Sequence, residues 1–139
     1  MEKLAQTNWK DGMAFDAEVN GHKLTIDADE KVGGKDRGPR PKPLLAVSLA
    51  GCTSMDVISI LKKMRVTPDF FDVEVFADST EEHPKHYNKI HLKYIFKGKD
   101  LPEDKINKAV NLSQDRYCGV SHMLGKAAEL THEIVIEES

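Results

Sequence analysis

Alternating apolar and polar positions predict a pair of strands near the start of the chain. Apolar side chains recur at every second residue from Met13 to Val19 and again from Leu24 to Ala28. Asn20 and Gly21 stand between the two runs, and both residue types tolerate the positive φ angles of a type I′ turn. The segment from Gly12 to Ala28 is therefore predicted to be a β-hairpin.

The longest apolar stretch of the chain, residues 44–64, predicts a helix. It follows Pro43, and proline suits the first turn of a helix because an N–H group there would have no acceptor within the helix. Lys62 and Lys63 place positive charge at the negative end of the helix dipole. Because apolar residues occur on nearly all sides, we expect a central, buried helix. Asp56 and several hydroxyl groups within the stretch argue against a membrane span.

Between the hairpin and this helix, residues 29–43 combine three glycines and three prolines with many charges. This composition predicts a long loop without regular structure. Loops of this length inside a compact domain usually have a function or are mobile.

The second half of the chain predicts strands, helices and a closing strand. Apolar positions alternate over 71–77 and over 90–96, and the opposite charges on the outward faces of these two strands favour antiparallel pairing. Two helices and a strand are expected to follow, over residues 102–117, 118–130 and 131–137. The order predicts an α+β fold with antiparallel sheets, in one domain spanning residues 1–139.

Composition narrows the classes of partner. Hydrophobic residues make up 40% of the chain and charged residues 31%, which is lean in apolar material, so part of the core is expected from a second copy in a homodimer. The net charge of -3 and the interspersed signs argue against a nucleic-acid partner. The first residues contain no apolar leader, which predicts a cytoplasmic location.

The chain has two cysteines, and Cys52 lies within the predicted central helix. Asp56 follows one helical turn later, where a carboxylate raises the pKa of a thiol. Cys52 would therefore need a cation from elsewhere to become a thiolate. The loop before the helix offers Arg37, Arg40 and Lys42.

Cys118 is predicted at the start of a helix, where free backbone N–H groups favour a thiolate. His122, one turn later, is near enough to act on this thiol, although a solvent-facing or packing histidine is more common. The two cysteines, Cys52 and Cys118, could be small buried hydrophobic residues, as most free cysteines are, or a dithiol that reacts with oxidants. Residues 81–86 hold two histidines and two acids that could form a metal site, but a charged loop explains them as well.

The motifs around the two cysteines resemble those of a known family. Residues 49–63, LAGCTSMDVISILKK, together with residues 117–121, YCGVS, resemble the OsmC/Ohr superfamily in its OsmC-like branch. The opening residues 9–15 and the loop residues 38–41 look similar to that branch as well. The resemblance covers essentially the whole chain.

This resemblance implies a fold and a reaction. The fold would be an intertwined homodimer in which antiparallel sheets wrap around two central helices. Cys52 would attack the O–O bond of an organic hydroperoxide, and Cys118 would then form a disulfide with it. An external small or protein dithiol would reduce that disulfide, so no bound cofactor or metal is expected.

The chain also departs from the family pattern. Active members hold the thiolate with an arginine of the N-terminal hairpin and a glutamate shortly before the helix cysteine, whereas no arginine here precedes Arg37. Lys42 and Pro43 stand where that glutamate would fall. Arg40 or Arg37 could take the cationic role. The alternative is a non-catalytic dimer that binds a small apolar or acyl ligand at its interface.

Overall fold

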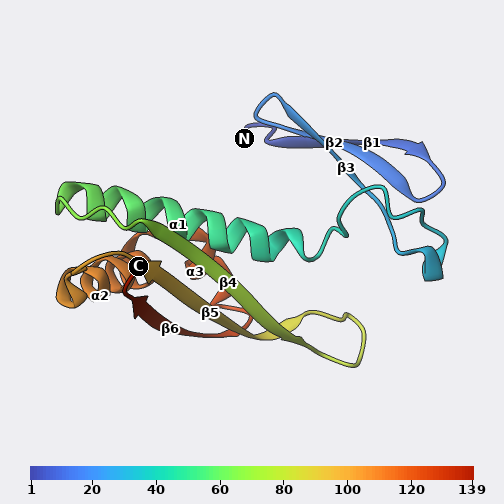
Figure 1. Ribbon diagram of the computed structural model, residues 1–139. Coiled ribbons are helices and arrows are strands. Elements are labelled where there is room, and N and C mark those ends of the chain that lie inside the picture. Colours follow the sequence, from blue (N-terminus) through green and yellow to red (C-terminus); the bar gives the residue numbers. More distant parts are fainter. The chain divides into compact units, whose positions relative to one another are not determined.

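The computed structural model describes residues 1–139, which form two compact units, residues 1–47 and 48–139. The first unit contains one antiparallel sheet in the order β1 (Ala5–Asp11), β2 (Ala14–Val19) and β3 (His22–Ile26) (Figure 1). Asn20 and Gly21 have φ angles of 51° and 77°, so the predicted hairpin turn is confirmed. Strand β1 was not predicted, because its sequence AQTNWKD has too few apolar residues to show an alternation.

The loop after β3 contains more order than its composition predicts. Residues Glu30–Val32 form a short 3₁₀ helix, η1, and the Asp29 side chain caps it by accepting a hydrogen bond from the Lys31 N–H at 2.9 Å. The expectation of a loop without regular structure is therefore wrong at this turn. The Asp29 side chain caps the start of the turn, and the Gly33 N–H closes its end by donating to the Glu30 carbonyl oxygen at 3.2 Å.

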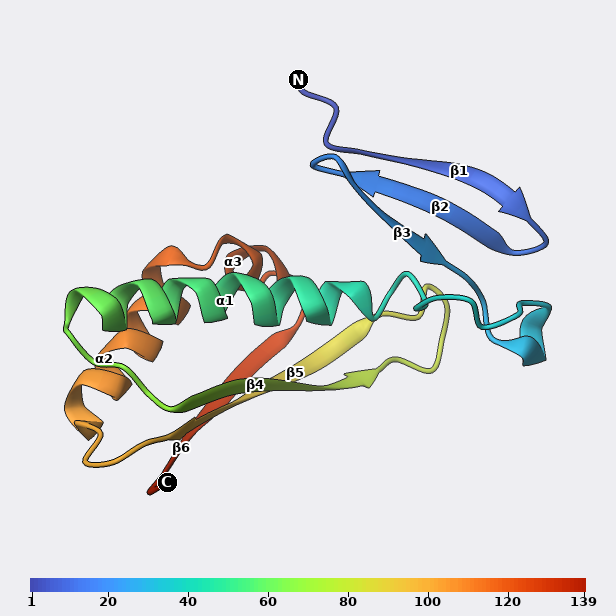
Figure 2. The same cartoon turned by 45° about the horizontal axis from the view of Figure 1, so that its top comes forward.

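The second unit is built on a three-stranded sheet in the order β4 (Phe70–Ser79), β5 (Tyr87–Lys97) and β6 (Glu129–Glu137). Helix α1 (Leu44–Lys63) continues across the boundary between the units and lies over one face of this sheet (Figures 1 and 2). Helix α2 (Glu103–Leu112), a π-helical turn η2 (Ser113–Tyr117) and helix α3 (Gly119–Leu124) connect β5 to β6. The α+β fold class is confirmed.

The pairing of the strands confirms one prediction and corrects another. Strands β4 and β5 are antiparallel and place Glu74 opposite Lys93 and Asp78 opposite Lys89, as their complementary charges predict. Strand β6, however, runs parallel to β5. The long helical crossover between β5 and β6 brings the chain back to the end of the sheet where β5 began, and this makes a parallel neighbour possible.

The last helix is shorter than predicted. Helix α3 ends at Leu124 and β6 begins at Glu129, whereas the sequence pattern placed the helix over 118–130. Leu130 pairs with Ile90 in the parallel ladder. Pairing with the central strand β5 therefore overrides the helical tendency predicted for Glu129 and Leu130.

Helix α1 buries one stripe and exposes the others. Its buried residues recur at four-residue intervals, at Leu49, Thr53, Val57 and Leu61. They pack with buried side chains of β5 and α2, namely Leu92, Tyr94, Phe96, Ile106, Ala109 and Val110. The outward side chains Met55 and Ile58 are exposed, so the helix is not buried on all sides within one chain. By length and composition alone α1 could also cross a membrane, but the core helix of a soluble protein passes the same test.

Candidate dithiol site

The structure brings the two cysteines together beside a carboxylate. Cys52 and Asp56 lie one turn apart on α1, and Cys118 stands between η2 and α3. The two sulfur atoms and a carboxylate oxygen of Asp56 all lie within 4.8 Å of one another. Both thiols are free, with Cys118 buried and Cys52 partly exposed. This is the geometry of a dithiol in which one thiol is open to solvent and the other is protected.

Cys118 caps helix α3, but the helix start does not make it a ready thiolate. Its sulfur accepts a hydrogen bond from the backbone N–H of Ser121 at 3.3 Å, and only 3% of the residue is exposed. Burial raises the pKa of the Cys118 thiol and outweighs the lowering by Ser121, and the neighbouring Cys52 raises it further. The expectation that this position favours a thiolate is therefore wrong, because the effect of burial is larger than that of the Ser121 side chain and backbone N–H together.

A chain of hydrogen bonds fixes the position of α1 relative to the turn that precedes Cys118. The Thr53 hydroxyl lies 2.7 Å from the Tyr94 hydroxyl and 2.8 Å from the Ser113 hydroxyl. Gln114 Nε2 donates to the Tyr94 oxygen at 2.7 Å, and Ser113 Oγ donates to Asp56 at 3.0 Å. Thr53, Tyr94 and Ser113 are fully buried.

The direction of these hydrogen bonds follows from counting donors. The Ser113 hydrogen is donated to Asp56, so the Thr53 hydrogen must be donated to Ser113 and the Tyr94 hydrogen to Thr53. Burial raises the pKa of Tyr94, which keeps its hydroxyl hydrogen in place. The chain therefore runs one way, from Gln114 to the Asp56 carboxylate, and each member strengthens the next.

Of the residues in this network, the sequence interpretation singled out only Asp56 and missed Thr53, Tyr94, Ser113 and Gln114. A small hydroxyl residue next to a helix cysteine, such as Thr53, is a weak signal because hydroxyls also fill exposed positions. The π-helical turn at Ser113–Tyr117 has no sequence signature either, although such turns are frequent at functional sites. Here the turn carries Ser113 and Gln114 toward α1 and then presents Cys118.

The predicted cations Arg37 and Arg40 lie in the first unit, where both contact carboxylates. Arg37 donates to Asp11 at 3.1 Å and to Asp27 at 3.2 Å. Arg40 donates to Asp36 at 2.7 Å and to the Gly38 carbonyl oxygen at 2.8 Å. These contacts order the loop before α1. A role of either guanidinium at Cys52 stays a prediction.

Asp27, just before this loop, accepts hydrogen bonds that hold the loop in place. Its carboxylate accepts hydrogen bonds from the backbone N–H groups of Ala28, Lys35 and Arg37, and only 2% of the residue is exposed. Burial alone would raise the pKa of Asp27, but the hydrogen bonds from Ala28 and Arg37 outweigh it and lower the pKa. The hydrogen bond from Arg37 likewise lowers the pKa of Asp11.

The histidines that the sequence suggested as candidates are exposed. The His122 backbone N–H donates to the Cys118 carbonyl oxygen at 3.1 Å, and its side chain faces solvent. His83 and His86 are exposed in the loop between β4 and β5, where His86 Nδ1 lies 2.7 Å from the Pro84 carbonyl oxygen. The metal-ligating side chains that the fold gathers are instead the two cysteines and Asp56.

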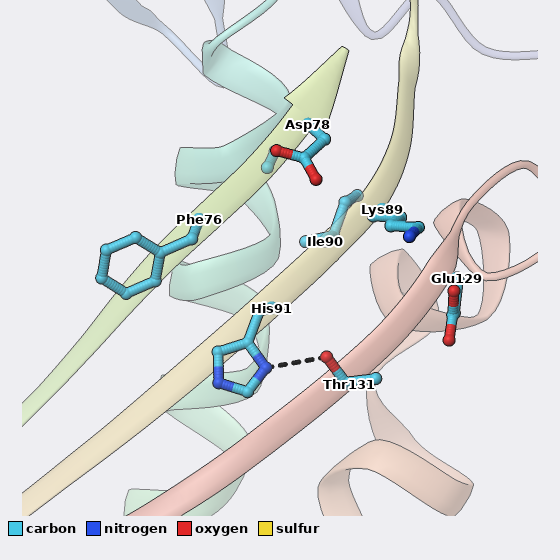
Figure 3. Close-up of a pocket in the computed structure, with 8 residues that line it drawn as sticks. Phe76, Asp78, Lys89, Ile90, His91, Glu129 and Thr131 are labelled. Atoms are coloured by element: carbon cyan, nitrogen blue, oxygen red, sulfur yellow. Dashed lines mark hydrogen bonds between the residues drawn. The ribbon is translucent and has the colours of Figure 1, made fainter. Parts of the chain in front are cut away.

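Two cavities of the second unit differ in their relation to the thiols. One of about 310 Å³ lies on the face of the sheet that points away from α1, where His91 Nδ1 is 2.7 Å from Thr131 Oγ1 (Figure 3). It is lined by strand residues and by neither cysteine. The other, of about 230 Å³, is lined by Asp56, Ser59, Ile60, Lys63 and Tyr117. Neither cysteine lines this cavity either, but Asp56 belongs both to its wall and to the dithiol site.

Comparisons with known proteins agree with the fold and with the motif resemblance. The family model described as OsmC-like protein matches residues 33–133. Protein YhfA of Escherichia coli strain K12 is 33% identical over 129 residues, which cover 92% of this chain and 93% of YhfA. The match therefore includes both cysteine motifs.

Solved structures share the architecture. A hypothetical protein from Aquifex aeolicus VF5 has a TM-score of 0.81 at 28% identity, with 98% of each chain covered. An organic hydroperoxide resistance protein OsmC from Legionella pneumophila has a TM-score of 0.72 at 13% identity, with 97% of each chain covered, a likeness of fold. From the matched residues, the identity to YhfA and the shared fold, we conclude that this chain belongs to the OsmC-like protein family.

Proposed function

We propose that this protein reduces organic hydroperoxides with Cys52 as the attacking thiol and Cys118 as the resolving thiol. The observation that carries the proposal is the approach of the two sulfurs, which come from segments far apart in the sequence and lie within 4.8 Å of each other. A pair of cysteines that only filled space would not need to meet. Solved structures of this fold from Legionella pneumophila and Bacillus subtilis are named as organic hydroperoxide resistance proteins, which supports the same chemistry.

The difference in exposure supports the division of roles. Cys52 is partly exposed and can meet a peroxide, whereas Cys118 is buried and its thiol has a raised pKa. A buried thiol with a raised pKa is a poor first nucleophile but can still be deprotonated when a sulfenic acid forms beside it. The cavity bordered by Asp56 and Tyr117 offers room for the organic part of the substrate.

The reaction balances in three steps. The Cys52 thiolate attacks the O–O bond of ROOH, the sulfur is oxidised to a sulfenic acid, and the alkoxide leaves and takes up a proton to become ROH. The Cys118 thiolate then attacks the Cys52 sulfur, an S–S bond forms, and hydroxide leaves and is protonated to water. A dithiol from solution reduces the disulfide, becomes a disulfide itself and restores both thiols.

The cation that stabilises the Cys52 thiolate is proposed to be Arg40 or Arg37, from the loop that precedes α1. A cation close to a thiol favours its thiolate form, and an arginine side chain stays positively charged in proteins. Each arginine is tested by substitution with glutamine, and the free energy of unfolding is measured alongside because Arg37 also holds Asp11 and Asp27.

The protein is also proposed to act as a homodimer. The exposed apolar side chains Met55 and Ile58 lie on the helix that carries Cys52, and a second copy packed on this face would remove them from water. Such packing would place the cysteines near a subunit interface.

The decisive experiment measures the consumption of an organic hydroperoxide in the presence of a dithiol reductant. Cys52→Ser should abolish consumption, whereas Cys118→Ser should retain one rapid turnover and then lose activity as the unresolved sulfenic acid overoxidises. His122→Ala, close to Cys118 in sequence but exposed, is the matched control and should consume peroxide like the unmutated protein. Equal rates in the unmutated protein and Cys52→Ser would refute the proposal. A small apolar molecule found bound by mass spectrometry, without peroxide consumption, would instead support the alternative of a ligand-binding dimer.

A further inference from the structure

The same two sulfurs and the Asp56 carboxylate form a triangle of metal-ligating atoms. Each of the three residues contributes one ligand atom, and all three atoms lie within 4.8 Å of one another. In a tetrahedral zinc site with Zn–S distances of about 2.3 Å, two sulfurs are separated by roughly 3.8 Å. Side-chain rotations that shift the ligand atoms by about 1 Å would therefore bring all three within coordination distance of one zinc ion.

We propose that Cys52, Asp56 and Cys118 bind a thiophilic divalent cation, best represented by Zn²⁺. Two thiolates and one carboxylate form a ligand set that suits zinc and that magnesium or calcium do not favour. Three protein ligands leave a fourth position for water or an exogenous ligand, and the partial exposure of Cys52 and Asp56 gives the ion a route to the site.

The surroundings hold the carboxylate in place for this role. Ser113 Oγ donates to Asp56 at 3.0 Å, and Ser113 is itself fixed by Thr53 at 2.8 Å inside the core. Hydrogen bonds to a ligating carboxylate from such outer groups orient it and raise metal affinity. The hydrogen-bond chain that positions the dithiol would therefore also position the third ligand.

Bound zinc and the peroxidase reaction would exclude each other, because a thiolate that ligates zinc is not free to attack an O–O bond and a disulfide cannot ligate zinc. The inference does not rest on the proposed function, since the same atoms would bind zinc whether or not Cys52 reacts with peroxides. The test is therefore made by direct binding, without an activity measurement.

The reduced, chelator-treated full-length protein is titrated with Co²⁺, and the sulfur-to-cobalt charge-transfer band is recorded. Zn²⁺ is then added to displace the cobalt, and competition with a chromogenic chelator gives the affinity. We expect one ion per chain and a charge-transfer intensity corresponding to two thiolates. Cys52→Ser and Cys118→Ser should each weaken zinc binding by at least about 100-fold, and Asp56→Asn and Ser113→Ala by about 10-fold.

The double variant His83→Ala/His86→Ala is the matched control, because it removes the other cluster of candidate ligands, and it should bind zinc unchanged. Alkylation of the unmutated protein checks the site without any substitution: zinc should protect the partly exposed Cys52 from iodoacetamide, and the intact mass measures the extent of alkylation. The proposal is overturned if Cys118→Ser binds zinc as tightly as the unmutated protein, if the histidine variant loses the ion, or if zinc leaves the alkylation of Cys52 unchanged.

Discussion

Replacing Ser113 by alanine removes one hydroxyl from the interior of the second unit and breaks two hydrogen bonds at once. Without Ser113, the hydroxyl hydrogens of Thr53 and Tyr94 have only each other's oxygens to bond with, so one of the two hydrogens loses its acceptor. Leaving a buried donor unpaired costs about 1–3 kcal/mol. Asp56 is partly exposed, so water can replace its lost hydrogen bond, which adds at most about 1 kcal/mol. We therefore expect Ser113→Ala to lower the free energy of unfolding by about 1–4 kcal/mol.

Ser121 provides the matched control. Its hydroxyl is also buried but makes no hydrogen bond of good geometry, although it faces the Cys118 sulfur closely enough to lower the pKa of that thiol. Ser121→Ala should therefore change the free energy of unfolding by no more than about 0.5 kcal/mol. Both variants are unfolded in urea at one fixed protein concentration, because dimerisation would make stability concentration-dependent, and helix content is followed by circular dichroism.

A double-mutant cycle isolates the hydrogen bond itself. Thr53→Val removes the hydroxyl that donates to Ser113 while keeping the shape of the side chain. In the double variant both partners of the Thr53–Ser113 hydrogen bond are absent, so neither is left unpaired. The double variant should therefore be destabilised by about 1 kcal/mol or more less than the sum of the two single variants. Additive effects, or a Ser113→Ala cost no larger than that of Ser121→Ala, would refute the account of the network.

Three further outcomes follow from other parts of the molecule. A Cβ at Gly38 would lie 1.9 Å from the Thr25 carbonyl oxygen, so Gly38→Ala should destabilise the protein by about 1–3 kcal/mol in urea unfolding. Gly51 lies in open space on α1, and Gly51→Ala should stabilise the protein by about 0.5–1 kcal/mol. Equal effects of the two substitutions would contradict the packing described. The lowered pKa of Asp27 contributes stability that is present above the pKa of about 3.9 of an unfolded aspartate and is lost as the pH falls through the lower folded value. Acid unfolding of Asp27→Asn should lack this pH dependence. Identical acid-unfolding profiles of the two proteins would contradict this role of Asp27. Met55→Lys should shift the molar mass measured by light scattering from dimer toward monomer, and an unchanged mass would remove this face from the proposed interface.

The amino-acid sequence by itself determines the local elements of this protein. Alternation specifies β2 to β5 because one face of each strand must be apolar, and Asn20-Gly21 specifies the hairpin because few other residues accept two successive positive φ angles. The one-turn spacing of Cys52 and Asp56 on α1 is likewise set by helix geometry. Family membership could be predicted as well, because the two cysteine motifs are local strings.

Only the tertiary structure decides what these elements do together. The crossover from β5 through α2 and α3 makes β6 a parallel neighbour and brings Cys118 to Cys52, and no periodicity within either segment contains that contact. Burial then reverses the expected effect of the helix start on the Cys118 thiol, because the cost of desolvation depends on atoms supplied by other segments. Thr53, Tyr94 and Ser113 form a network for the same reason: each is an ordinary polar residue in its own segment, and only their shared burial obliges them to pair.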